Sequence, residues 1–418
     1  MSKSLIPEDW AIVLLGFIII GISLAGVIIL APEYNWTTSA ELTGKVLAAG
    51  NLLKILWQFA LVYAAAVAGV ALIGKSVIGT LKAFPFIYLL TVLALILAGN
   101  STVKEYNLEA VIFSLIIGLL IGNLFKLPQW FKNALTSEFF VKIGLVLLGT
   151  TIIFADILKA GSLGLIQALL VVISVWYFSY WVCKRLKIDD ELTMMLSSAV
   201  SICGVSAAIA TSGAIKGDSK KLSLVISLVL ITAVPMMVFM PYIAKALGLS
   251  QEVTGAWLGG SIDTTGAVVA SGSLVGETAL KISTIVKFSQ NVLLGVAAFA
   301  ISVYWTYTKH PNAKDKENKP TLAVIWDRFP KFVIGFIAAS ILFSFFLSAD
   351  AIAPVKAPLK NLQGLWFALA FTSIGLETNF RDLVNKESRK PVYAFLVAQG
   401  FNVVVTLGIA YLLFDYFA

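Results

Sequence analysis

The residues best suited to chemistry in this chain are polar groups that lie inside long apolar runs. In residues 259–272 (GGSIDTTGAVVASG), Asp263 lies among hydroxyl side chains within an apolar segment of membrane length. An ionisable residue at bilayer depth is energetically costly, so it usually has both a partner and a function. The flanking glycines predict that the helix is interrupted here, and interrupted backbone is tolerated at this depth only where it lines a cavity. We therefore expect a binding site at this segment.

A second polar run resembles the first. Residues 199–213 read AVSICGVSAAIATSG, and an ungapped alignment of residues 201–210 with residues 261–270 matches Ser, Ile and two Ala. Cys203 then falls opposite Asp263. Each match is weak by itself, and small-residue packing is the alternative explanation.

A spaced Gly, Phe and Asp triplet also occurs twice, near the ends of two other apolar segments. The two copies are Gly149, Phe154, Asp156 and Gly375, Phe380, Asp382. Together with the two polar runs, they favour the inverted internal repeats from which many secondary transporters are built.

The composition indicates a membrane protein. Hydrophobic residues make up 59% of the 418 residues and charged residues only 13%. This is typical of an all-α polytopic membrane protein and not of a soluble domain. Cys183 and Cys203 both lie in apolar segments, so no disulfide framework is expected, and the single histidine, His310, excludes a histidine-based metal site. We expect no cofactor and no nucleic-acid partner.

The chain contains about 13 apolar segments, separated mostly by short polar turns. They cover residues 10–30, 52–73, 83–99, 108–125, 140–158, 163–183, 192–215, 222–247, 253–276, 283–307, 331–348, 364–380 and 391–417. We divide the chain into N-terminal scaffold segments (1–107), a transport core (108–308), a polar cytoplasmic loop (309–323) and C-terminal membrane segments (324–418).

The direction in which each segment runs constrains its shape. If every segment crosses the membrane, residues 192–215 and 253–276 run the same way, whereas inverted repeats must run in opposite directions. Re-entrant hairpins that begin at opposite faces satisfy this condition, with tips at residues 203–206 and 263–266; crossing helices that unwind at mid-membrane are the alternative.

The loops on the side of the N-terminus contain more Lys and Arg residues than the loops on the other side. The positive-inside rule therefore predicts a cytoplasmic N-terminus in a bacterial inner membrane.

The chemistry of the tips favours an anion. Helix ends that meet at mid-membrane direct unpaired N–H groups and a partial positive charge into the cavity. Lys287 could face the substrate, pair with Asp263 or extend to the membrane interface, and Asp263 could bind the coupling ion or act structurally. The expected substrate-binding residues are Ser201, Cys203, Gly204, Ser206, Ser261, Thr264, Thr265, Gly266, Lys287, Gln290 and Asn291, with Asp263 as the ion-coupling residue.

Four separated motifs resemble those of the bacterial YeiH family, whose members are described as sulfate exporters. The motifs are residues 201–208, 261–272, 286–291 and 373–380. The resemblance covers residues 108–418 and implies export or exchange of sulfate, a related oxyanion or an organosulfonate. Many relatives carry His-Asp where this chain has Asp263-Thr264, and Arg in place of Gln290.

The function predicted from the sequence is secondary active transport of a small anion, coupled to protons or sodium. A monovalent cation/proton antiporter is the alternative, with Asp263 as the ion ligand. An intramembrane enzyme is not expected, because the Gly-x-Gly-Asp signature and any His or Cys dyad are missing. The expected partners are the anion, the coupling ion, the lipid bilayer and a second copy of the chain.

Overall fold

The computed structural model describes residues 5–27, 30–105, 110–309, 323–378 and 389–416. Regular structure in these residues is helical, apart from one isolated β-bridge between Trp36 and Asn100. The chain forms two compact units, each built from two stretches of sequence. Unit 1 comprises Met1–Ala155 and Lys331–Asn379, and unit 2 comprises Asp156–Pro330 and Phe380–Ala418. The predicted all-α membrane fold is confirmed.

Unit 1 is a helical bundle in which glycine residues lie where two helices pack closely against each other. Gly375 packs against Gly118, and a Cβ atom at Gly122 would lie 2.8 Å from the carbonyl oxygen of Leu376, so these two helices can approach closely only because they carry glycine. The helices of unit 1 are α1 (Glu8–Leu24), α2 (Ser39–Glu41), η1 (Leu42–Val46), α3 (Ala49–Leu72), α4 (Val77–Ala98), α5 (Ser101–Glu105), α6 (Ala110–Leu124), α7 (Gln129–Lys132), α8 (Ser137–Leu148), η2 (Gly149–Thr151), α17 (Lys331–Ile341), η5 (Leu342–Phe346) and α18 (Ala349–Glu377).

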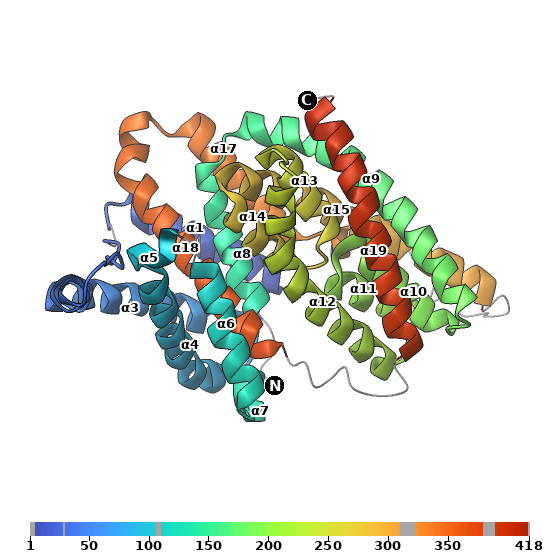
Figure 1. The fold of residues 1–418 in the computed structure, drawn as a ribbon, viewed down its shortest axis with the longest axis horizontal. Helices are drawn as coiled ribbons and strands as arrows, with labels where there is room; N and C mark the ends of the chain where they lie inside the picture. Colours follow the sequence, from blue (N-terminus) through green and yellow to red (C-terminus); the bar gives the residue numbers. More distant parts are fainter. Residues whose placement is uncertain (1–4, 28–29, 106–109, 310–322, 379–388, 417–418) are drawn as a thin grey trace. The chain divides into compact units, whose positions relative to one another are not determined.

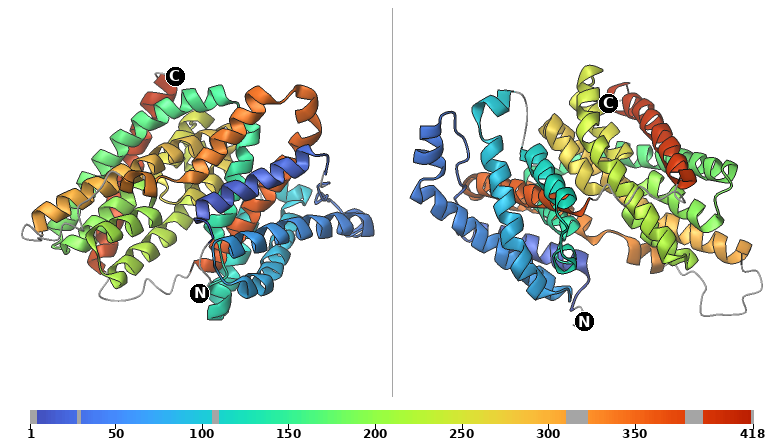
Figure 2. Two further views of the ribbon diagram at one scale, coloured as in Figure 1. Left: turned by 180° about the vertical axis from the view of Figure 1, so that it is seen from behind. Right: turned by 60° about the horizontal axis from the view of Figure 1, so that its bottom comes forward.

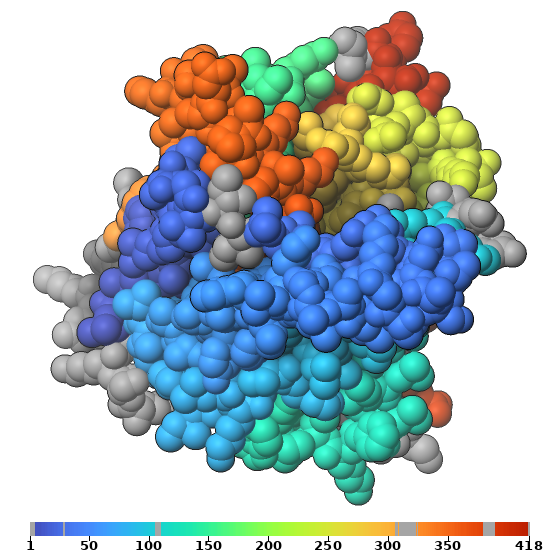
Figure 3. Space-filling model, turned by 90° about the vertical axis from the view of Figure 1, so that its left-hand side faces the viewer, coloured from blue at the N-terminus to red at the C-terminus, as the bar shows by residue number. Residues whose placement is uncertain are grey.

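Residues of α3 and α4 cover one face of unit 1, in blue in Figure 3. Large hydrophobic residues are exposed along both helices, including Leu53, Leu56 and Trp57 on α3 and Ile78 and Leu89 on α4. Exposed apolar patches of this kind mark surfaces that contact another apolar phase. This face therefore suits contact with lipid.

Unit 2 contains both of the polar runs. Its long helices α9 and α19 lie side by side, with the rings of Phe178 and Phe401 stacked at 3.8 Å (Figure 1). The helices of unit 2 are α9 (Phe154–Arg185), α10 (Asp190–Ser198), η3 (Ala199–Cys203), α11 (Val205–Ile215), α12 (Ser219–Ala246), α13 (Gln251–Ser261), α14 (Thr265–Val275), α15 (Glu277–Lys309), α16 (Ala323–Arg328), α19 (Arg389–Tyr411) and η8 (Leu412–Tyr416).

Each of the 13 predicted apolar segments corresponds to helical structure. Seven helical stretches within the described residues are long and apolar enough to cross a membrane, and the two polar runs form pairs of short helices instead. The boundaries of the two units differ from the sequence-based division into four parts, although both interrupted segments belong to one unit. Residues 310–322 of the expected polar loop, and the residues Phe380 and Asp382 of the repeated triplet, lie outside the described residues.

The first hairpin comprises α10, η3 and α11. It returns to the end where it began: Asp189, the N-cap of α10, forms an ion pair of 2.7 Å with Lys221 at the start of α12. Glu191 in the first turn of α10 also accepts a hydrogen bond from the backbone N–H of Asp218 over 3.3 Å. The chain therefore enters and leaves this segment at one face.

The second hairpin comprises α13 and α14. A Cβ atom placed on Gly276, directly after α14, would lie 2.5 Å from the side-chain oxygen of Gln251, the first residue of α13. The start and the end of this segment are therefore adjacent. Each arm has 11 residues and rises about 16 Å, so an arm reaches only the middle of a bilayer.

The two hairpins open toward opposite ends of α15. Along α14, Thr265 lies beside Asn291 and Gly272 beside Leu280, so this arm runs from its tip toward the start of α15. Along α11, Ala210 clusters with Ala298 instead, so that arm runs toward the end of α15. Figure 2 shows the ribbon from two further directions, with the first hairpin in green and the second in yellow. Both interrupted segments are therefore helical hairpins whose two ends lie close together, the geometry that the re-entrant prediction requires.

Candidate substrate and ion site at the hairpin tips

The tips of the two hairpins touch at a glycine. Gly204 has a φ of 56°, and a Cβ atom there would lie 2.6 Å from a methyl of Val229 and 3.1 Å from the Cβ of Asp263. A positive φ suits glycine, and the contact leaves no room for a larger side chain. The break in the first hairpin therefore lies directly against the ionisable residue of the second.

Lys287 is held at this junction by neutral oxygen atoms. Its side chain is 1% exposed, and Nζ donates to the carbonyl oxygen of Ile202 over 2.9 Å and to Oε1 of Gln290 over 3.0 Å. The interpretation that Lys287 extends to the membrane interface is wrong, because the side chain is enclosed within unit 2. Its electrostatic neighbours include Asp263 and Cys203.

Three side-chain amides hold the carbonyl groups at the ends of the entering arms. Gln290 donates to the oxygen of Gly260 over 3.0 Å, and Gln399 donates to the oxygen of Ser261 over 2.8 Å. Asn402 donates from one nitrogen to Val200 in the first hairpin, over 3.1 Å, and to Ser261 in the second, over 3.2 Å. One amide of α19 thus bridges both tips.

These contacts make Gln399 and Asn402 site residues that sequence reasoning missed. Thr406 donates to Oδ1 of Asn402 over 2.8 Å, which orients the Asn402 amide so that its nitrogen faces the hairpins. The spacing of these residues in the sequence could have identified them, because the amides at positions 399 and 402 and the hydroxyl at position 406 share one face of an apolar helix. Polar groups within a membrane helix usually face the protein interior.

The leaving arms begin at helix N-termini that are more accessible. Four of the expected binding residues are half-buried, namely Ser206, Thr264, Thr265 and Gly266, and all lie within the first turns or at the N-caps of α11 and α14. The hydroxyl of Thr264 caps α14 by accepting from the N–H of Ala267 over 3.3 Å. The hydroxyl of Thr265 accepts from Asn291 over 3.3 Å.

Two of the hydroxyl groups expected to contact the substrate donate to backbone carbonyl groups instead. Ser201 donates to the oxygen of Ser197 over 2.7 Å, and Ser261 donates to that of Trp257 over 2.6 Å, each within its own arm. Both side chains are buried. They shape the tips, and their hydroxyl protons already have acceptors.

Asp263 carries an oxygen atom without a partner. The residue is 2% exposed, and no described residue forms a hydrogen bond with its Oδ2 atom. Lys287 and Gln399 are its electrostatic neighbours. Buried polar atoms normally have a hydrogen-bond partner, so this atom marks Asp263 as distinct from the other buried polar residues of the tips that do have partners.

Comparison with known proteins identifies relatives of this chain. A family model described as "Conserved hypothetical protein 698" matches residues 82–394. A UPF0324 membrane protein of Rhodopirellula baltica, RB9488, is 42% identical over 324 residues, which cover 75% of this chain and 59% of that protein. A UPF0324 membrane protein of Nitratidesulfovibrio vulgaris is 40% identical over 333 residues, with coverage of 75% and 56%. The chain thus spans less than two thirds of the length of these relatives.

A search of solved structures finds one weak likeness. The sodium proton antiporter MjNhaP1 from Methanocaldococcus jannaschii at pH 8 aligns over 79% of this chain and 99% of that chain, with 10% sequence identity and a TM-score of 0.20. At that score the likeness carries no argument about fold or function.

Proposed function

From the hairpin site, we propose that this chain is a secondary transporter of a small anion. The chain belongs to the family described as "Conserved hypothetical protein 698", whose members include the UPF0324 membrane proteins. This membership confirms the resemblance to the YeiH family. The proposed substrates are sulfate, a related oxyanion or an organosulfonate, exported or exchanged with coupling to protons or sodium. We place the transporter in a bacterial inner membrane with a cytoplasmic N-terminus.

The observation that carries this proposal is the contact of Lys287 with the carbonyl oxygen of Ile202. Helix C-termini attract cations because their last carbonyl groups are unpaired and carry partial negative charge. Here a protein cation and three amides already hold the carbonyl groups at the tips. A substrate cation would have to displace them.

The helix N-termini of α11 and α14 are the ends left for a ligand. They carry partial positive charge and N–H groups, which suit sulfate, phosphate and carboxylate. Their half-buried residues Ser206, Thr264 and Thr265 can add hydroxyl contacts. Lys287 adds a full positive charge close by, so a divalent anion would be favoured.

Asp263 supplies a route to coupling. A negative carboxylate beside the tips opposes anion binding, and adding a proton removes that repulsion. An anion and a proton would therefore bind together and be released together. A sodium ion at the unpartnered Oδ2 atom would neutralise the same charge.

Transport by the purified full chain in proteoliposomes tests the proposal. We expect labelled sulfate or 2-hydroxyethanesulfonate to accumulate when a proton or sodium gradient is imposed, and not when the gradient is collapsed with an ionophore. Accumulation of sodium driven by a proton gradient, with no anion movement, would overturn it.

The cation/proton antiporter remains a second candidate because of one specific feature, the buried Oδ2 atom of Asp263, which forms no hydrogen bond with any described residue. For this function, proton-driven sodium or potassium exchange should occur in liposomes free of sulfate and sulfonates. A thermal-shift series with sulfate, sulfonates and sodium separates the two functions before reconstitution, because only the ligand that binds should raise the melting temperature.

A further inference from the structure

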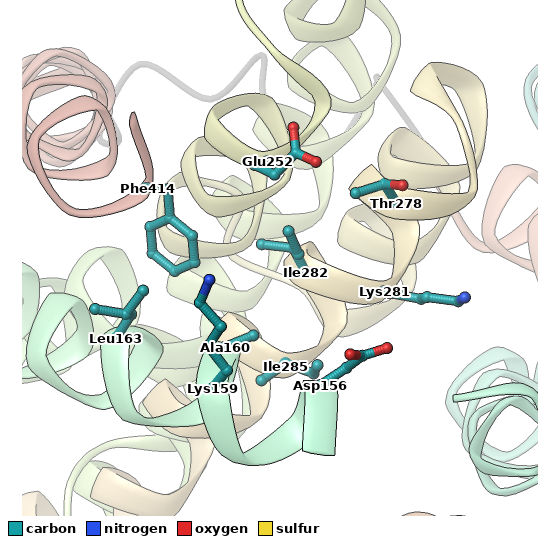
Figure 4. Close-up of a pocket in the computed structure, with 10 residues that line it drawn as sticks. All are labelled: Asp156, Lys159, Ala160, Leu163, Glu252, Thr278, Lys281, Ile282, Ile285 and Phe414. Atoms are coloured by element: carbon teal, nitrogen blue, oxygen red, sulfur yellow. The ribbon is translucent and has the colours of Figure 1, made fainter. Parts of the chain in front are cut away.

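A cavity lies away from the hairpin tips, at the open end of the second hairpin. Its volume is about 280 Å³, and it is lined by residues near the starts of α9, α13 and α15 together with Phe414 of η8. The side chains that define it are Asp156, Lys159, Glu252, Lys281 and Phe414 (Figure 4). The cavity lies wholly within unit 2.

The cavity has charged walls and an apolar floor. Two carboxylates and two ammonium groups surround it, whereas Ala160, Leu163, Ile282, Ile285 and Phe414 supply apolar surface. Figure 4 shows the side chain of Lys159 extending toward the ring of Phe414, with Glu252 beyond Ile282 and both Asp156 and Lys281 at the other side. Positive and negative groups therefore lie on both sides of one apolar surface.

Three of these charges lack an ion-pair partner within the described part of the chain, namely Asp156, Lys159 and Glu252. Lys281 is paired with Glu277, one turn earlier in α15, over 3.3 Å. A ligand with a single charge would leave the opposite groups without a counterpart. A ligand that carries both charges can satisfy an ammonium and a carboxylate at once.

We propose that this cavity binds a small zwitterion, a molecule with an ammonium group and a sulfonate or carboxylate joined by a short apolar body. Lys159 would hold the anionic end, Asp156 or Glu252 the cationic end, and Ile282 and Ile285 the body. The volume lies just below the range of roughly 300–1,000 Å³ typical of pockets for drug-sized ligands, which suits a molecule the size of an amino acid. Because the charges are exposed, we expect weak binding, with a Kd on the order of millimolar.

This site is independent of the proposed transport site. Its floor lies on the side of α15 that faces α9, where a Cβ atom on Gly164 would lie 3.3 Å from Val286. That close contact separates the cavity from the level of Lys287. The ligand could be a free solute or the headgroup of a zwitterionic lipid, since both present the same chemistry.

Calorimetric titration of the full-length Lys287→Gln protein, in which the proposed organosulfonate site at the hairpin tips is weakened, tests the proposal with three ligands of matched body. The ligands are 2-aminoethanesulfonate, ethanesulfonate and ethylamine. We expect the zwitterion to bind roughly two- to fivefold more tightly than either singly charged analogue, the scale of one exposed charge contact. Equal binding of the three would overturn the proposal.

Variants separate this site from the hairpin tips. In the Lys287→Gln background, Ala160→Phe should fill the cavity and abolish binding of 2-aminoethanesulfonate. In the wild-type background Ala160→Phe should leave sulfate binding unchanged, whereas Lys287→Gln alone should weaken sulfate binding and leave the cavity intact. Lys159→Gln and Asp156→Asn should each weaken zwitterion binding roughly two- to fivefold, the usual scale for an exposed charge contact. Lys245→Gln, an exposed lysine on α12, is the matched control and should change nothing. Undiminished zwitterion binding in a folded protein that carries both Ala160→Phe and Lys287→Gln would overturn the proposal.

Native mass spectrometry distinguishes the two sources. Phosphatidylethanolamine retained by the wild type and lost in Ala160→Phe, with phosphatidylglycerol unaffected, would identify a lipid headgroup; binding of the soluble zwitterion alone would identify a solute. If neither binds, the cavity is not a zwitterion site.

Discussion

The ammonium group of Lys287 donates to the carbonyl oxygen of Ile202 over 2.9 Å, although 85 positions separate the two residues in sequence. A full positive charge is thereby held by the partially negative end of a broken helix, inside the protein. Protein groups make both hydrogen bonds of the ammonium group. In the proposed function, the anion would bind at the helix ends of opposite polarity.

The first prediction concerns this lysine. Lys287→Gln removes a charge-assisted interaction worth roughly 1.5–3 kcal/mol, so we expect apparent affinity for sulfate to fall about ten- to a hundredfold. Lys287→Arg should have a smaller effect, because a planar guanidinium replaces a compact point charge at the same place. Initial rates of uptake against sulfate concentration give the affinities.

Lys245→Gln serves as the control because Lys245 is exposed and distant in sequence from the tips. If both Lys287 variants transported with the affinity of the wild type, the anion site would not depend on this charge. If Lys287→Gln fails to fold and Asp263→Asn restores stability in the double variant without restoring coupling, Lys287 serves to neutralise Asp263.

The second prediction concerns pH. In the wild type, lowering the pH should strengthen anion binding, because protonation of Asp263 removes a negative charge beside the site. Asp263→Asn keeps the shape of the protonated side chain, so sulfate binding should persist with a flat pH profile, and gradient-driven accumulation should be lost. Binding and uptake measured over the same pH series check both statements.

Asp218→Asn is the matched control, since Asp218 is a helix cap outside the tips. Normal accumulation and an unchanged pH profile in Asp263→Asn would mean that the carboxylate is structural.

The sequence predicted the positions of the two breaks because local chemistry determines them. Gly204 adopts a positive φ, and the run at Asp263 carries polar residues that cap short helices, so both interruptions were visible in the residue types. The shapes of the hairpins followed from the number and direction of the apolar segments. Pairing of segments depends on long-range packing instead, and the contact of Gly375 with Gly118 could not be read from either segment alone.

The partners within the site were less predictable. A lysine in an apolar segment can bind a carboxylate, a carbonyl group or water, and only the fold shows that Lys287 binds the oxygen of Ile202. Ser201 and Ser261 were expected to contact substrate, yet their hydroxyl protons satisfy carbonyl groups one turn earlier. Amide residues have four hydrogen-bonding groups and many possible neighbours, which is why Asn402 went unassigned.

The third prediction concerns topology. In a chain free of its native cysteines, Ser219→Cys at the mouth of the first hairpin should react with a membrane-impermeant thiol reagent from the cytoplasmic side, and Lys245→Cys from the opposite side. Both positions are exposed, at opposite ends of α12. Labelling of Ser219→Cys from outside alone would contradict the predicted orientation of the N-terminus.

The fourth prediction concerns Asn402, which donates to both hairpins. Asn402→Leu keeps a similar volume but leaves the carbonyl groups of Val200 and Ser261 without this donor, and each lost buried contact costs roughly 1–3 kcal/mol. We expect the first hairpin to open more often, so that Cys203, which is 6% exposed at its tip, reacts at least about fivefold faster with a small thiol reagent. Mass spectrometry of the Cys183→Ser protein follows Cys203 alone.

Gln399→Leu provides the matched comparison. The hairpin carbonyl group to which Gln399 donates is that of Ser261 in the second hairpin, whereas Asn402 donates to both hairpins. It should leave the reactivity of Cys203 close to that of the wild type while weakening coupling through Asp263. Equal acceleration in both variants would indicate general loosening of α19. An unchanged rate in Asn402→Leu would show that Lys287 alone holds the first tip, because its contact with Ile202 would then be sufficient.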